Sequence, residues 1–237
     1  MFLGAFSCPK KFFGGNNMKK TLTGKITVSA MLIALAYIAT FCTSFIKVGG
    51  FLSLDIKDAV LSIVSLMFGP LYGFLSVIAV ALIEFITISG TGVYGLIMNI
   101  ISSGTFALII GYVYGYKRNI FGAISASALT VIYVTVTMVA ANIFITPIYF
   151  EMPQVAVLEL LPTILLFNLS KATLNASIML ILYKPLTSAF KKFGLIKTDE
   201  NVKFKYNWKS VVLLIVAVLL ICGAIFVFNS LGIKIEK

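Results

Sequence analysis

A short polar run interrupts an apolar stretch late in the sequence. The segment FNLSKATLN (167–175) carries Asn168, Lys171 and Asn175, whereas the residues on either side of it are almost all apolar. Spacings of three and then four residues place these side chains on one face of a helix. A charged residue at the centre of a membrane helix costs about 2.5–3.5 kcal/mol on insertion scales, so Lys171 needs a partner or a polar cavity. The run therefore indicates either a ligand site or a buried polar network.

Two further amides lie in apolar surroundings. Asn99 occurs in GLIMNIISSG and Asn142 in AANIFITPIY. Amide side chains both donate and accept hydrogen bonds, whereas lysine only donates. Such a set suits a neutral, polar ligand with carbonyl, imide and hydroxyl groups better than a bare cation. The alternative is purely structural, with hydrogen bonds between helices and an ion pair between Lys171 and Glu84.

The elements that must position these residues are membrane helices. The chain has 237 residues, of which 60% are hydrophobic and 11% charged, against about 45–50% and about 25% in soluble domains. A β-barrel is disfavoured because the segments are continuously apolar instead of alternating. We expect an all-α integral membrane protein with six core transmembrane helices and a seventh C-terminal one. The expected helices span 26–46, 55–69, 71–89, 94–115, 120–147 and 159–184, with the seventh at 209–229 and a turn at FGPLYG between the second and third.

The charge distribution predicts the topology. The net charge is +11, and most of the 19 lysine and arginine residues lie in 10–25, 117–118 and 184–209. Loops 88–94 and 146–158 contain none, which is the positive-inside pattern. We therefore expect a multi-pass protein of a bacterial plasma membrane. Its basic residues would lie beside the lipid bilayer, and we expect no nucleic acid partner. The N-terminus would be cytoplasmic, and the C-terminus extracytoplasmic if the seventh helix spans. The expected divisions are an N-terminal extension (1–20), a six-helix domain (21–193), a basic linker (194–208) and the additional helix with a short tail (209–237).

The sequence motifs give little support for an enzymatic function. The chain has no histidine, which excludes histidine-based triads and HExxH metal sites. GTGVYG (90–95) matches G-x-G-x-x-G, but it joins two expected membrane helices and has no preceding strand. Asp55 and Asp58 lie one turn apart on one expected helix, where carboxylates favour the helix N-terminus. We predict that the protein is not an enzyme and uses no cofactor. The alternatives are an intramembrane enzyme, or a secondary transporter with Glu84 as its proton site.

Several motifs together resemble a known family. In chain order they are SAMLIALA (29–36), LSLDIKD (52–58), FGPLYG (68–73), NIISSGTF (99–106), NIFITPIY (142–149) and FNLSK (167–171). This pattern is similar to the substrate-binding S-components of energy-coupling factor (ECF) vitamin transporters, and most similar to their riboflavin-binding members. The resemblance covers about residues 20–193. It implies a binding subunit of an ABC-type importer that works with a transmembrane coupling subunit and two ATPases.

The resemblance also implies roles for individual residues. Asn142, Asn168 and Lys171 would contact the flavin, with Asn99 a further candidate. Leu54 and Asp55, in LSLD, would lie over the site together with the GTGVYG loop. In a separate role, Ala30 and Ala34 would meet the coupling subunit, although such small-residue spacing also serves internal packing.

One residue departs from the pattern of the flavin-binding members. They often carry a Lys-Asn pair in the third helix, whereas this chain has Glu84 there. Glu84 could alter the preference for substrate, or it could neutralise Lys171. The alternative ligands are therefore other vitamins or precursors, such as pantothenate.

Overall fold

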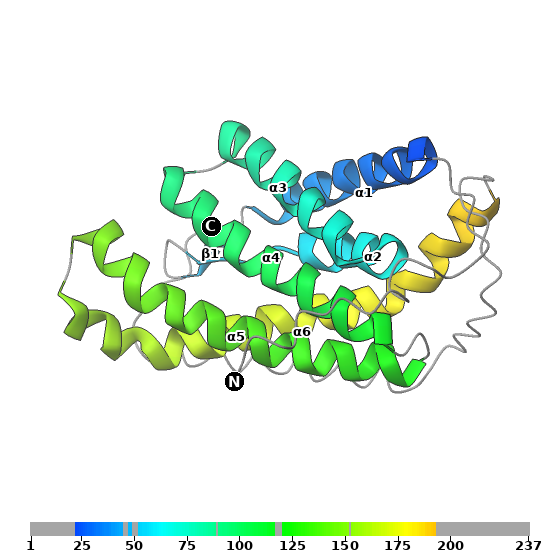
Figure 1. The fold of residues 1–237 in the computed structure, drawn as a ribbon. Helices are drawn as coiled ribbons and strands as arrows, with labels where there is room; N and C mark the ends of the chain where they lie inside the picture. Colours follow the sequence, from blue (N-terminus) through cyan, green and yellow to red (C-terminus); the bar gives the residue numbers. More distant parts are fainter. Residues whose placement is uncertain are drawn as a thin grey trace, which may run out of the picture.

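The described part of the chain folds into a bundle of six helices with one short strand pair (Figure 1). The computed structural model describes residues 22–44, 47–48, 52–88, 90–116, 120–151 and 153–192. Within these ranges the elements are α1 (Leu22–Thr43), β1 (Lys47–Val48), β2 (Leu52–Ser53), α2 (Lys57–Phe68), α3 (Pro70–Thr87), α4 (Gly92–Tyr116), α5 (Ile120–Phe150) and α6 (Gln154–Lys192). The expected extension (1–20), linker (194–208) and seventh helix (209–229) lie outside the described residues.

Helix α2 forms the centre of the bundle. In Figure 1, α1 and α3 run along one side and α5 and α6 along the other, with α2 and α4 between them. Helix α2 packs against α1, α3, α4 and α6, and its residues from Lys57 to Leu66 are all buried. Polar residues on this helix are therefore buried in the protein core and do not face lipid.

The six-helix core predicted from the sequence is confirmed, with one difference in α2. Five described helices, namely α1, α3, α4, α5 and α6, are long and apolar enough to cross a membrane. Helix α2 has only 12 residues, which at 1.5 Å per residue is about 18 Å and too short for about 30 Å of hydrocarbon. The antiparallel pair of β1 and β2, with Lys47 opposite Ser53, was not predicted. Two residues per strand are too few to produce a recognisable alternating pattern.

The predicted turn at FGPLYG separates α2 from α3. Gly69 has φ +104°, a conformation that glycine adopts readily, and Pro70 is the first residue of α3. A Cβ atom on Gly73 would lie 1.7 Å from Ser65 Oγ, so the missing side chain allows the two helices to pack closely. The hairpin thereby fixes α2, and the acidic and basic residues at its start, against the rest of the bundle.

Candidate substrate-binding site

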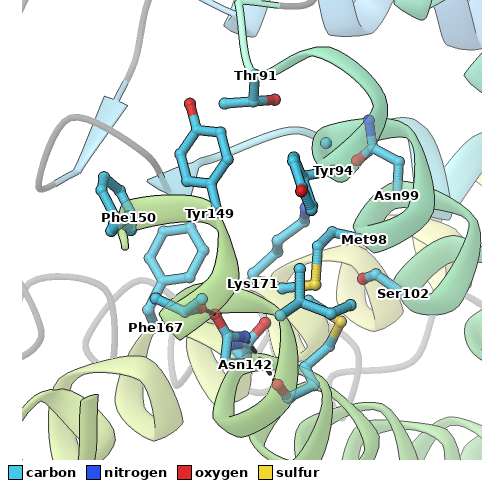
Figure 2. A pocket seen from close by; sticks show the side chains of 15 residues that line it. Thr91, Tyr94, Met98, Asn99, Ser102, Asn142, Tyr149, Phe150, Phe167 and Lys171 are labelled. Carbon is cyan, nitrogen blue, oxygen red and sulfur yellow. Dashed lines mark hydrogen bonds between the residues drawn. The ribbon is translucent and has the colours of Figure 1, made fainter. Parts of the chain in front are cut away.

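A cavity lies between α4, α5 and α6 (Figure 2). It contains about 750 Å³ of space free of protein atoms, its open mouth included. Its lining residues are Thr91, Tyr94, Gly95, Met98, Asn99, Ser102, Met138, Asn142, Ile145, Thr146, Tyr149, Phe150, Phe167, Asn168 and Lys171. Four residues predicted from the sequence, Asn99, Asn142, Asn168 and Lys171, thus line one cavity although they come from three helices.

The amide orientations in the cavity follow from the chemistry of their partners. Asn142 Nδ2 donates to Met138 O at 2.7 Å, and Asn168 Nδ2 donates to Ile164 O at 2.8 Å. A backbone carbonyl can only accept, so each amide must turn its nitrogen toward it. Thr146 Oγ1 donates to Asn142 Oδ1 at 2.9 Å. Asn142 and Asn168 are both buried and are held in place by their own helices.

Aromatic and methionine side chains form the apolar part of the cavity wall. The rings of Tyr94 and Tyr149 meet edge to face with centroids 5.6 Å apart, and the Tyr149 and Phe150 centroids are 4.7 Å apart. Phe167 lies one position before Asn168 and is buried. The cavity therefore combines apolar surface for a flat, aromatic or aliphatic ligand with a small number of polar groups. Sequence reasoning did not single out these aromatic residues.

Lys171 forms a buried ion pair at the edge of the cavity. Its Nζ donates to Asp55 Oδ2 at 2.8 Å, with side chains 10% and 3% exposed. The alternative pair between Lys171 and Glu84 is therefore wrong. Asp55, which was expected to lie over the site with Leu54, is instead buried beside Lys171, and neither Asp55 nor Leu54 lines the cavity. The partner is 116 residues away in sequence, which local spacing cannot reveal.

Asn175, which sequence reasoning left without a role, fixes the segment that carries Asp55. Its Oδ1 accepts from Ala59 N at 2.9 Å, and its Nδ2 donates to Asp55 O at 2.9 Å and to Lys171 O at 3.1 Å. Ile56, at the start of α2, makes no side-chain capping hydrogen bond. Asn175 thus satisfies one free N–H of α2 from a different helix. This contact holds Asp55 and Lys171 in register with each other.

Glu84 belongs to a second buried ion pair. Its Oε2 accepts from Lys57 Nζ and, at 3.1 Å, from Asn99 Nδ2. Glu84 does not itself line the cavity, so it reaches the site only through Asn99. Lys57 is also 3.9 Å from Asp55 Oδ2, and it therefore joins the two ion pairs. Lys57 was missed from the sequence, where it resembled an ordinary charged residue at a helix start.

The GTGVYG segment lies at the cavity, with Thr91, Tyr94 and Gly95 among the lining residues. It spans the start of α4, and Gly92 there has φ +60°. The preceding element is helix α3, whereas a dinucleotide-binding motif follows a strand. The segment therefore serves as part of the cavity wall.

Ala30 and Ala34 lie on the outer surface of α1, where both are exposed. The buried face of α1 instead consists of Val28, Ser29, Leu32, Ala36 and Thr40. The two alanines do not serve packing within the described bundle.

Comparison with known proteins identifies the family. The family model of the ECF transporter substrate-specific component matches residues 24–183, about two thirds of the chain. The chain belongs to this family. The matched range contains every residue that lines the cavity and both buried ion pairs. ECF substrate-specific components bind a substrate and associate with a module of coupling subunit and ATPases. The family is a class of transport components and not of enzymes.

The fold of this substrate-specific component agrees with a solved structure. A chain described as "Structure and mechanism of the S component of a bacterial ECF transporter" is similar at a TM-score of 0.62 and 23% sequence identity. The match covers 71% of this chain and 98% of that one. At this level of identity the likeness supports the fold. No curated protein matches the chain significantly.

Proposed function

We propose that this substrate-specific component binds riboflavin or a close flavin for ATP-driven uptake. The observation that carries the proposal is the convergence of Asn99, Asn142, Asn168 and Lys171 on one cavity beside aromatic side chains. These are the positions that the resemblance to riboflavin-binding members selects. The cavity mouth would face the extracytoplasmic side, where loops 88–94 and 146–158 contain no lysine or arginine.

The chemistry of a flavin matches the groups on the cavity wall. An isoalloxazine ring presents carbonyls and an imide N–H along one edge, and Lys171 retains two N–H groups after its bond to Asp55. Amide oxygens of Asn99 or Asn168 could accept from the imide or from ribityl hydroxyls. Tyr94, Tyr149 and Phe167 offer surfaces on which the ring can pack.

The ligand can be identified without assuming its class. We expect the protein, purified from cells grown with riboflavin, to retain a flavin that mass spectrometry detects after denaturation. Ser177→Ala serves as a control. Ser177 is buried on α6, the helix that carries Asn168 and Lys171, and its hydroxyl bonds only to Thr173 O. This control should retain the same ligand. Enrichment of pantothenate or another non-flavin vitamin in the wild-type protein would replace the flavin assignment.

The exposed alanines of α1 lead to a prediction about the coupling subunit. We propose that Ala30 and Ala34 form the contact with it, because only small side chains allow two helices to approach closely. Ala30→Trp and Ala34→Trp should each reduce co-purification of the coupling subunit at least tenfold and leave riboflavin binding unchanged. Ala128→Trp, at an exposed alanine of α5, provides the control. Equal loss in the control, or no loss in either α1 variant, would contradict this interface.

A further inference from the structure

A network of two buried lysines and two buried carboxylates lies beside the cavity, and only Lys171 of this network lines the cavity wall. Lys171 pairs with Asp55, and Lys57 pairs with Glu84. Asp58, a third carboxyl group, is also buried at the start of α2, so it cannot supply a further cation. The two ion pairs sum to zero formal charge. A ligand in the cavity therefore meets no uncompensated cation among the described residues, even though a lysine lines the wall.

The carboxylates of these pairs have acceptor capacity to spare. Asp55 Oδ1 and Glu84 Oε1 are buried and accept no hydrogen bond from the described part of the chain. A carboxylate with one unused oxygen leaves a negative potential in its surroundings, which low-dielectric protein screens weakly. An anionic group that approached Lys171 would lie close to Asp55 as well, because only 2.8 Å separates the Lys171 ammonium from Asp55 Oδ2. Like charges at such distances repel.

The amides on the cavity wall also disfavour an anionic ligand. Asn99 directs Nδ2 to Glu84, and Asn168 directs Nδ2 to a backbone carbonyl. Their Oδ1 atoms make no hydrogen bond within the described ranges and remain to accept from a ligand. Carbonyl oxygens repel an anion and attract N–H or O–H groups. Beside them, Lys171 still has two N–H groups to donate to a neutral carbonyl.

We propose that the cavity selects a ligand that is uncharged where it meets Lys171, and that Asp55 sets this selectivity by neutralising the lysine. The inference rests on the proposed function only in taking the cavity as the ligand site. It excludes carboxylates such as pantothenate and favours neutral groups with adjacent carbonyl and N–H, such as an imide. Asp55 is a positioning residue in this scheme, because it acts through Lys171 and does not touch the ligand.

Sodium formate tests the proposal in the ligand-free protein. Formate is a small carboxylate that can reach Lys171 from the cavity and replace a missing aspartate carboxylate. Asp55→Ala should gain about 2–4 °C in the midpoint of thermal unfolding as formate is added, and the gain should saturate. The wild type and Asp55→Ala/Lys171→Met should show no such gain at the same salt concentration. Asp55→Asn, which keeps the side-chain shape, replaces the alanine variant if that one does not fold.

Three results of the formate experiment would overturn the proposal. They are a formate response of the wild type as large as that of Asp55→Ala, a response that persists in Asp55→Ala/Lys171→Met, and no response in any protein. Pantothenate binding to the wild type at least as tightly as its neutral alcohol, pantothenol, would also overturn it. A failure to bind riboflavin leaves the formate result standing, so failure of the flavin assignment is distinguishable from failure of the charge selectivity.

Discussion

Lys171→Met should weaken riboflavin binding at least tenfold while the protein still inserts and folds. Among the described residues that line the cavity, the substitution removes the only cationic donor, and methionine cannot donate to a flavin carbonyl. It also leaves the Asp55 carboxylate buried without its nearest cation, and breaking a buried ion pair costs about 3–5 kcal/mol. Fluorescence titration with riboflavin measures the first effect, and thermal unfolding in detergent measures the second.

A double variant separates these two effects. Asp55→Asn/Lys171→Met removes the stranded charge, so it should recover most of the stability that Lys171→Met loses. Its riboflavin affinity should stay at least tenfold below that of the wild type. If affinity returned together with stability, Lys171 would be a structural residue and not a ligand contact. Unchanged affinity in Lys171→Met itself would lead to the same conclusion.

Asn175→Ala should produce the second large effect, a loss of about 2–5 kcal/mol in the free energy of unfolding. The substitution strands the buried N–H of Ala59 and removes hydrogen bonds from two carbonyls, those of Asp55 and Lys171. Asn175 is 0% exposed, so water cannot readily replace the amide. Thermal unfolding should show the loss as a lower midpoint, with a weaker affinity for riboflavin because Asp55 and Lys171 lose their alignment.

Ser177→Ala is the matched control for Asn175→Ala. Ser177 is equally buried on α6, but its hydroxyl bonds only to Thr173 O within the same helix. We expect its removal to change the free energy of unfolding by less than about 1.5 kcal/mol. Equal destabilisation by the two substitutions would show that Asn175 does not act as a bridge between α6 and the start of α2.

The sequence was sufficient to predict the helices and the polar face of α6. Long apolar runs fix most helices within about four residues because membrane helices have a narrow range of lengths. Helix α6 (Gln154–Lys192) is the exception, since it extends beyond the predicted span of 159–184 at both ends. Amides and a lysine in such runs are conspicuous, since each would be costly in lipid. The segment FGPLYG predicts its turn through Gly69 and Pro70, whose backbone preferences suit a helix end followed by a helix start.

The ion pairs could not be predicted, because they depend on contacts distant in sequence. Asp55 and Lys171 are 116 positions apart, and Lys57 and Glu84 are 27 apart. Several charge pairings were compatible with the same helices, and the pairing of Lys171 with Glu84 was the wrong one. The aromatic wall was hidden for another reason. The chain contains 20 phenylalanines and 10 tyrosines, and most such residues in a membrane protein pack against lipid or core.

The role of Lys57 follows from the burial of α2. A lysine beside two aspartates at a helix start normally indicates a solvated turn. Here α2 lies between four other helices, and Lys57 is only 2% exposed. Its ammonium compensates Glu84, the residue that departs from the pattern of flavin-binding members. The negative charge of Glu84 therefore has its counter-ion, Lys57, within the protein.

The most direct test of the flavin assignment is a titration of the flavin-free wild-type protein with riboflavin. If the cavity binds a flavin, its fluorescence should be quenched saturably at one molecule per chain, with a dissociation constant below about 1 µM. Lys171→Met should shift the curve at least tenfold, whereas Ser177→Ala should leave it in place. A titration with no quenching at micromolar riboflavin would contradict the assignment.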